Sequence, residues 1–421
     1  LVGDDRVLIE EIKTTSAPLE RLRQAQDPTH WGQVQVYAYL YALQTASLAE
    51  APSLAEAPSL AEAPSLAEAP SLAELPRMVI RLTYYQLDTE EILELERPVD
   101  FKELARFFDD LLARYLSWAR TLADWAAERD AALAGLSFPL PEFRAGQRPM
   151  AVAVYRRIRD GGYLMIEAPT GIGKTLGTLF PAAKALGEGH VEKIFYLTAR
   201  TTGRLTAQAA AEALNAGRAA LKTLVLTAKE KICPHPEAAC TPEECPCAHG
   251  HYDRVNIALN ELFEADLISA EAVSACAQRH CVCPFELSLD LALWVDCIVC
   301  DYNYVFDPRV RLRRFFEERS GAYAFLVDEA HNLVDRAREM FSANLNKGAV
   351  LALRREVKAL QPGIYKTLGR INTWMLKARQ RCEAEDDAYT EAAAPEELLP
   401  HLRDFHRRSE AVLASMRPGA D

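Results

Sequence analysis

From residue 147 to residue 329 the sequence alternates helical segments with short apolar runs of strand length. The apolar runs cover residues 162–168, 193–199, 222–227, 297–300 and 324–329. Strands that alternate with helices are typical of βαβ units, in which successive strands lie parallel in one sheet. The sequence therefore predicts an α/β fold built on a parallel sheet. With 421 residues, the chain has room for about two to four domains.

A loop that contains two glycines follows the first apolar run and precedes a helical segment. The loop consists of Ala168, Pro169, Thr170, Gly171, Ile172, Gly173, Lys174 and Thr175, with Ala168 where such loops usually begin with glycine. Glycines let backbone N–H groups turn toward phosphates, and the helix N-terminus adds a favourable dipole. We expect this loop to bind ATP, with Lys174 on the β- and γ-phosphates and the Thr175 hydroxyl on Mg²⁺.

An acidic pair, Asp328 and Glu329, ends the last apolar run and is followed by Ala330 and His331. A carboxylate at a strand end can hold Mg²⁺, and its neighbour can polarise the attacking water. An ordinary strand–helix turn with an acidic cap is the alternative, but the two motifs agree in order and in strand context. The sequence therefore predicts a Mg²⁺-ATP site with Lys174, Asp328, Glu329 and His331 as catalytic candidates.

Together the loop and the acidic pair resemble the first motor domain of superfamily 2 helicases, whose sheet is RecA-like. The segment Phe-Arg-Ala-Gly-Gln, which contains Arg144 and Gln147, looks like the adenine-reading segment of that family, with Gln147 on the base. The segment Tyr-Leu-Thr-Ala-Arg-Thr resembles its next motif, which touches the DNA backbone. Hydroxyl and guanidinium groups suit phosphate contacts, so Thr198, Arg200 and Thr201 are candidates, with helix capping as the alternative role of Thr198 and Arg200.

Nine of the ten cysteines lie between Cys233 and Cys300. A disulfide framework suits a small secreted chain, and this sequence begins with no secretion signal. Crowded thiols therefore indicate a metal or cluster site. Four of them, Cys233, Cys240, Cys245 and Cys283, could hold either Zn²⁺ or a [4Fe–4S] cluster, and their uneven spacing favours iron–sulfur only slightly.

The sequence around these thiols resembles the cluster insert of the DinG/XPD family of DNA helicases. The segments that carry the resemblance are residues 231–233, 240–246, 250–254, 283–287 and 301–308. The resemblance implies a [4Fe–4S] cluster on Cys233, Cys240, Cys245 and Cys283, the last of which directly precedes a proline. Cys247 departs from the family pattern. The remaining thiols are expected to be buried or idle: Cys276, Cys281, Cys297, Cys300 and Cys382.

The DinG/XPD resemblance covers residues 142–421. It implies a motor domain 1 over residues 142–332 with the iron–sulfur insert at 228–290, and the start of a helical Arch domain over 333–421. It also implies translocation along single-stranded DNA in the 5′→3′ direction and a role in DNA repair or replication. The second motor domain that such helicases need is not found in this sequence, so we expect the chain to be a piece of a longer protein.

The first 98 residues carry a different pattern. Glu11 and Lys13 form an E-x-K triplet, and Gln33 and Tyr37 lie one helical turn apart. The expected elements are a strand over 7–13, a helix over 32–46 and a strand over 77–87, and a helix over 100–134 follows this region. These features resemble the RecB-like branch of PD-(D/E)XK nucleases, in which Glu11 would bind Mg²⁺ and Lys13 would orient the water. An inactive, nuclease-like DNA-binding module is the alternative.

Two further segments complete the expected organisation. Residues 46–75 repeat the hexapeptide Ser-Leu-Ala-Glu-Ala-Pro, whose regular prolines exclude a continuous helix. Residues 99–141 are expected to form a helical linker between the nuclease-like domain and the motor domain.

The charge of the chain is unevenly distributed. The formal net charge is −12, but residues 142–232 contain 14 Lys and Arg against 7 Asp and Glu. A basic region in an acidic protein fits a surface that follows phosphates, so single-stranded or forked DNA is the expected partner. No apolar run approaches the ~18 residues of a membrane span, and a cytoplasmic location is expected. The alternatives to a helicase are a silent single-stranded DNA-binding module and a redox sensor.

Overall fold

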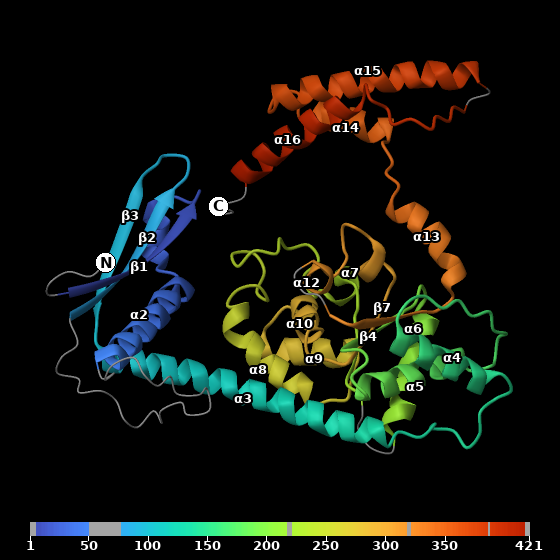
Figure 1. Cartoon of the computed structure of the whole chain (residues 1–421). Helices are drawn as coiled ribbons and strands as arrows, with labels where there is room; N and C mark the ends of the chain where they lie inside the picture. The colour runs from blue at the N-terminus through green and yellow to red at the C-terminus, as the bar shows by residue number, and fades with distance from the viewer. Residues whose placement is uncertain (1–5, 50–76, 217–220, 318–320, 386–387, 417–421) are drawn as a thin grey trace. The chain divides into compact units, whose positions relative to one another are not determined.

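The computed structural model describes residues 6–49, 77–216, 221–317, 321–385 and 388–416 (Figure 1). The chain divides into two units, one formed by residues 118–343 and the other by residues 1–117 together with 344–421. Among the helices in these described ranges, none has both the length and the apolar character that crossing a membrane requires.

A five-stranded parallel sheet forms the centre of the unit 118–343. Its strand order is β6-β5-β7-β4-β8. The strands are β4 (Lys193–Leu197), β5 (Thr223–Val225), β6 (Leu267–Ile268), β7 (Cys297–Cys300) and β8 (Tyr323–Val327). Every pairing in this sheet is parallel. The predicted α/β fold with a parallel sheet is therefore confirmed.

Helices connect these strands and cover both faces of the sheet. They are α4 (Gln147–Asp160), α5 (Lys174–Gly187), α6 (Thr201–Asn215), α7 (Lys229–Ile232), α8 (His251–Phe263), α9 (Ala270–His280), α10 (Pro284–Leu291), α11 (Asn303–Phe306), α12 (Arg313–Phe316), the 3₁₀ helix η1 (Ala330–Asn332) and α13 (Leu333–Met340). In Figure 1, α4–α6 (green) and α8–α10 (yellow) lie on opposite sides of β4 and β7.

Strand β4 shows how two cores are built, because successive side chains of a strand point to opposite faces. Ile194 and Tyr196 pack with apolar residues of α5 and α6. Phe195 and Leu197 pack with apolar residues of α8, α9 and α10. Burying an aliphatic or aromatic side chain of this size stabilises a fold by about 1.5–3 kcal/mol. The cysteine-rich insert therefore contributes helices to one of the two main cores of the unit.

The strand predicted over residues 162–168 is not present in the structure, and that prediction is wrong. Gly161 and Gly162, both at positive φ (74° and 101°), turn the chain after α4. The residues that follow form no strand, and Tyr163 and Met165 are 98% and 93% exposed. An apolar run becomes a strand only where a neighbouring strand hydrogen bonds with its backbone groups. Within the described chain, β8 at the edge of the sheet pairs with β4 alone, so residues 162–168 do not add a strand beside it.

The N-terminal part of the chain contains a three-stranded sheet of order β1-β2-β3. The elements are β1 (Arg6–Thr15), α1 (Leu19–Ala25), α2 (Pro28–Ala49), β2 (Arg77–Gln86), β3 (Ile92–Val99) and α3 (Phe101–Ala134). β1 and β2 are parallel, and β2 and β3 are antiparallel. The four elements expected from the sequence are all present, and β3 was not expected. Of the hexapeptide repeat, residues 46–49 end α2, and the remainder lies outside the described residues.

The C-terminal part of the chain is helical, as the sequence predicts. It contains α14 (Lys347–Glu356), α15 (Pro362–Ala384) and α16 (Leu399–Met416). These helices enclose a small core of their own, formed by Val350, Ile364, Leu368, Ile371 and Leu398. Thr367 on α15 donates a hydrogen bond to Asp404 on α16 at 2.7 Å.

Candidate functional site

The phosphate loop and the acidic pair meet at the carboxyl edge of the parallel sheet. Lys174 is the first residue of α5, and Asp328 directly follows β8. The Nζ atom of Lys174 lies 3.2 Å from Oε1 of Glu329. The backbone N–H of Asp328 donates to the carbonyl of Leu197, at the end of β4 (2.9 Å). The fold therefore brings together two motifs that are more than 150 residues apart in the sequence.

The phosphate loop takes its shape from two glycines in the left-handed region. Gly171 and Gly173 have φ of 85° and 83°, values that favour glycine because it has no Cβ. Lys174 and Thr175 begin α5, so backbone N–H groups of its first turn have no partner within the helix. Together with the helix dipole, this arrangement suits an anion such as phosphate.

Arg144 and Gln147 support the loop by hydrogen bonding with its backbone. The Arg144 guanidinium donates to the carbonyl of Gly171, and Nε2 of Gln147 donates to the carbonyl of Gly173 at 3.0 Å. Oε1 of Gln147 accepts the backbone N–H of Arg144, also at 3.0 Å. Gln147 is only 1% exposed, and both ends of its amide are bonded to protein. In this structure Gln147 supports the loop, and its contact with an adenine base stays a prediction.

A buried tyrosine, Tyr196, lies beside the metal-binding candidates Thr175 and Asp328 and interacts electrostatically with Asp328. Burial raises the pKa of Tyr196 above its ordinary value, so the hydroxyl stays protonated and can donate. Burial also raises the pKa of Asp328, the neighbouring Glu329 adds to the rise, and Lys174 opposes it. The sequence analysis gave Tyr196 no role. In the structure its side chain lies on the face of β4 that α5 covers.

A second tyrosine, Tyr302, fixes the backbone of the acidic pair. Its hydroxyl donates to the carbonyls of Asp328 and Glu329, the latter at 3.1 Å. Glu329 has φ of 51°, a left-handed conformation that costs a non-glycine residue about 1–2 kcal/mol. Burial raises the pKa of Tyr302 to about 12, so this donor also remains protonated. His331 is exposed, and its Nδ1 lies 3.4 Å from Glu329 Oε2.

The candidate DNA contacts separate into buried and exposed residues. Thr198 is buried, and its hydroxyl bonds with the backbone of Arg200, donating to its carbonyl (3.3 Å) and accepting from its N–H (3.4 Å). Thr198 therefore orders the turn that leads into α6, and its contact with a phosphate stays a prediction. Arg200 and Thr201 are exposed where α6 begins, so their side chains are accessible to a phosphate.

The four cysteines expected to be ligands lie in a turn-rich segment and near its end. Lys229 donates to Sγ of Cys240 at 2.9 Å. This bond raises the pKa of Lys229, and the thiols of Cys233 and Cys283 act in the same direction. Cys245 is buried, and Cys233 and Cys283 are half-buried. The thiols are therefore neighbours, and as soft sulfur donors they suit an iron–sulfur cluster or zinc.

Two tests bear on the ligand set of this insert. A tetrahedral zinc site would hold its sulfurs about 3.8 Å apart, whereas within the described chain no three of these thiols have mutual separations below 4.8 Å. Cys247 lies beside the same thiols: burial raises its pKa to about 11, with Cys245 and Cys283 adding to the rise.

Of the thiols expected to be buried or idle, Cys276, Cys297 and Cys300 are buried, Cys382 is half-buried, and Cys281 is exposed.

Arg254 and His251 on α8 support the segment that ends in Cys283. The Arg254 guanidinium donates to the carbonyls of His280 (2.9 Å) and Cys281 (2.7 Å). Nδ1 of His251 accepts the backbone N–H of Cys283 at 3.3 Å. Sequence analysis assigned these two residues to the family resemblance without a role, and the structure gives them one.

In the N-terminal sheet, three of the four nuclease candidates come together. Nζ of Lys13 lies 2.7 Å from Oε1 of Glu11 and donates to Oε1 of Gln33 at 2.8 Å. The first two residues are on β1 and the third is on α2. Tyr37, one turn further along α2, is 47% exposed.

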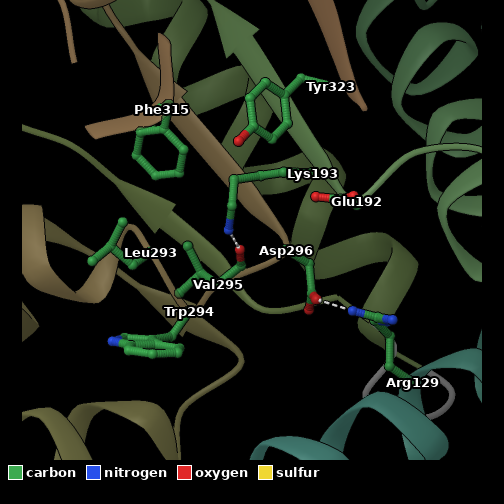
Figure 2. Close-up of a pocket in the computed structure, with 9 residues that line it drawn as sticks. All are labelled: Arg129, Glu192, Lys193, Leu293, Trp294, Val295, Asp296, Phe315 and Tyr323. Carbon is green, nitrogen blue, oxygen red and sulfur yellow. Dashed lines mark hydrogen bonds and ion pairs between the residues drawn. The ribbon is translucent and has the colours of Figure 1, made fainter. Parts of the chain in front are cut away.

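A pocket of about 390 Å³ lies at the opposite, amino-terminal edge of the parallel sheet (Figure 2). Figure 2 shows Lys193 reaching the carbonyl of Val295 and Arg129 reaching Asp296. The Asp296 carboxylate is buried and accepts hydrogen bonds from Arg129 (2.7 Å), the Trp125 indole (3.1 Å) and the backbone N–H of Lys222 (2.8 Å). Sequence analysis did not foresee this group, which attaches α3 to the start of β7.

Comparison with known proteins gives a family match over part of the chain. Residues 198–350 match the model of the DEAD_2 family. A regulator of telomere elongation helicase 1 homolog of Drosophila yakuba is 24% identical over 265 residues, which cover 48% of this chain and 26% of that protein. The human regulator of telomere elongation helicase 1 is 25% identical over 289 residues, covering 54% and 23%.

A Fanconi anemia group J protein homolog of Gallus gallus is 33% identical over 75 residues, which cover 18% of this chain and 6% of that protein. Among solved structures, one titled truncated XPD aligns with a TM-score of 0.39 and 17% identity, covering 63% of this chain and 76% of the other. The chain spans about a quarter of the length of the two telomere-helicase relatives.

Proposed function

We propose that this chain carries the first motor half of an ATP-dependent DNA helicase of the DinG/XPD kind. The observation that carries the proposal is the 3.2 Å contact between Lys174 and Glu329, at the carboxyl edge of a parallel sheet. The DEAD_2 match over residues 198–350 supports it, as do relatives that are named helicases. In this reading motor domain 1 covers residues 142–332, and residues 333–421 begin the Arch domain.

The chemistry follows from the residues at that edge. The phosphate loop and Lys174 would bind the triphosphate, and Thr175 and Asp328 would hold Mg²⁺, which neutralises charge that develops on the phosphates. The buried Tyr196 lies beside both of these side chains. Glu329 is the base that would take a proton from the attacking water, with His331 beside it.

The proposed track is single-stranded DNA, followed in the 5′→3′ direction during repair or replication. Arg200 and Thr201 are the accessible phosphate contacts. The insert at residues 228–290 would hold a [4Fe–4S] cluster on Cys233, Cys240, Cys245 and Cys283. The thiols of these cysteines must lose their protons to bind it. The cluster would give this turn-rich segment a rigid centre.

The decisive test is ATP binding by this chain. Lys174→Ala should weaken binding of a fluorescent Mg²⁺-ATP analogue at least tenfold, whereas Arg156→Ala, which removes an exposed cation from α4, should leave it unchanged. Equal affinity in the two variants would contradict the assignment of the loop. In the full-length protein, a motor also requires ATP hydrolysis that single-stranded DNA stimulates, and binding of DNA without stimulation would favour a silent binding module.

The cluster has a separate test. Anaerobically purified protein should contain iron and sulfide, and Cys283→Ser should lose both while Cys382→Ser, outside the insert, retains them. Iron-free protein that holds zinc would contradict the cluster. DNA affinity that changes with the oxidation state of the cluster would favour the redox-sensor alternative.

We also propose that the N-terminal sheet is a nuclease-like module, because Glu11, Lys13 and Gln33 converge within hydrogen-bond distance. A carboxylate and a lysine in contact can bind Mg²⁺ and orient a water. Glu11→Ala should reduce Mg²⁺ binding, while Glu20→Ala on α1 should not. If Mg²⁺ binds equally to both variants, the metal site is refuted and a DNA-binding module without metal remains.

A further inference from the structure

A group of metal-binding side chains lies outside the sites described above, between α8 and α9. Glu261 is on α8, and Cys276 and His280 are on α9. One ligand atom from each, a carboxylate oxygen, the sulfur and a ring nitrogen, lies within 4.8 Å of the other two. Cys276 and His280 are four residues apart, so they share one face of α9. That face meets Glu261 where the two helices pack together.

The side chains of this group are already oriented toward one another. Nε2 of His280 lies 2.6 Å from Oε2 of Glu261. Arg279 pairs with the other carboxylate oxygen, Oε1, which leaves Oε2 facing the histidine. The sulfur of Cys276 is fully buried, 3.6 Å from the carbonyl of Ala258. The side chains of His280 and Glu261 are 22% and 38% exposed. One side of the group is therefore open to water and the other is closed by the core.

We propose that Glu261, Cys276 and His280 bind a zinc ion, with water as the fourth ligand. Zinc takes sulfur, nitrogen and oxygen donors at about 2.0–2.3 Å, which places tetrahedral ligand atoms about 3.3–3.8 Å apart. The three atoms here lie between 2.6 and 4.8 Å apart. Rotation of the two partly exposed side chains reaches the required spacing without movement of the buried sulfur. A thiolate donor excludes magnesium and calcium, which prefer oxygen.

The position of this site gives it a structural consequence. α9 ends at His280, three residues before Cys283, and Arg254 of α8 already holds the carbonyls of His280 and Cys281. A zinc ion between Glu261 and α9 would add a second link between the two helices. It would stabilise the approach to Cys283 whether or not that residue binds a cluster, so the inference does not rest on the proposed helicase function.

Cobalt(II) provides the test, because thiolate-bound cobalt absorbs in the near ultraviolet and tetrahedral cobalt absorbs in the visible. The full chain is titrated anaerobically with Co²⁺, and bound metal is counted. Cys276→Ala and His280→Gln should each lose an equivalent of tetrahedral cobalt, with at least about tenfold weaker binding. The control variants are Cys240→Ser in the insert and the exposed His406→Gln on α16, which should both retain that equivalent.

Two results would overturn the zinc site. One is bound cobalt that Cys276→Ala and His280→Gln both retain and that Cys240→Ser loses, because the metal would then lie in the insert. The other is the absence of tetrahedral cobalt from all variants, because Glu261, His280 and Arg279 would then form a hydrogen-bonded network only. His280→Gln changes a partly exposed side chain, so it decides the question even if the core substitution Cys276→Ala unfolds the unit.

Discussion

The two left-handed glycines of the phosphate loop allow the role of Gln147 to be isolated. A Cβ at Gly171 (φ 85°) would meet nothing within 4 Å. A Cβ at Gly173 (φ 83°) would lie 2.4 Å from Nε2 of Gln147, the atom that donates to the carbonyl of Gly173. Alanine therefore has the same backbone cost at both positions but displaces a neighbour at only one of them.

The expected magnitudes follow from these contacts. A left-handed alanine costs about 1–2 kcal/mol, so Gly171→Ala should destabilise the loop by that amount in the nucleotide-free chain. At Gly173 the alanine also forces the buried Gln147 amide from its partner, and an unsatisfied buried polar group costs about 1–3 kcal/mol. Gly173→Ala should therefore cost about 2–5 kcal/mol.

Hydrogen exchange of the Gly177 amide, which donates to the carbonyl of Gly173 at 2.9 Å, reads out this local stability when measured by mass spectrometry. Since about 1.4 kcal/mol corresponds to a factor of ten, exchange in Gly173→Ala should be about 5 to 150 times faster than in Gly171→Ala. The effects of Gly173→Ala and Gln147→Ala should also fail to add, because both act on one contact. Equal exchange in the two glycine variants would refute the reasoning.

Three further predictions concern the acidic pair and the buried carboxylate at the other edge of the sheet. Because burial and Glu329 raise the folded-state pKa of Asp328, its ionised form costs stability at neutral pH, so Asp328→Asn should raise the melting temperature of the nucleotide-free chain at pH 7. This advantage should shrink as the pH falls through the raised pKa toward the ordinary value of 3.8, and a lower melting temperature at pH 7 would contradict it. Asp296→Ala leaves Arg129 paired with Asp130 alone and removes the acceptor of the Trp125 indole and the Lys222 N–H, so it should lower the free energy of unfolding in urea by about 1–3 kcal/mol; the exposed Glu192→Ala at the same pocket should change it by less than about 0.5 kcal/mol. Tyr302→Phe removes the donor to the acidic pair and, in the full-length protein, should reduce DNA-stimulated ATP turnover about tenfold with little change in ATP affinity, and a loss of affinity alone would show that Tyr302 acts elsewhere.

The sheet could be predicted where a strand is buried on both faces. β4 and β7 are buried along their whole length, and such strands appear in the sequence as short continuous apolar runs. The same signal failed at residues 162–168, because hydrogen bonding from a neighbouring strand is a property of the tertiary structure. β3 was missed for the opposite reason: it lies at the edge of its sheet, carries alternating glutamates, and contains Pro98.

The candidate site was predicted only as far as local motifs reach. Lys174 and Glu329 belong to recognisable segments, and the structure brings them together. Tyr196 and Tyr302 also lie in such segments, but their roles could not be predicted, because their hydroxyls meet the acidic pair only when β4, β7 and β8 align at one edge. The contact of Cys276 with Glu261 and His280 likewise depends on the packing of α8 against α9, which spacing along the chain does not specify.

Glu329 is held by two contacts of different strength, one through its carboxylate and one through its backbone. The ion pair between Lys174 and Glu329 is partly exposed, and such pairs contribute only about 0–1 kcal/mol, so a triphosphate can draw Lys174 away at little cost. The backbone of Glu329 is held independently, by the hydroxyl of the buried Tyr302. Arrival of the nucleotide would therefore release the Glu329 carboxylate without displacing its main chain. The proposed general-base role of Glu329 requires a carboxylate that is unoccupied but already in position when the phosphate binds, and these two contacts of unequal strength would provide both conditions.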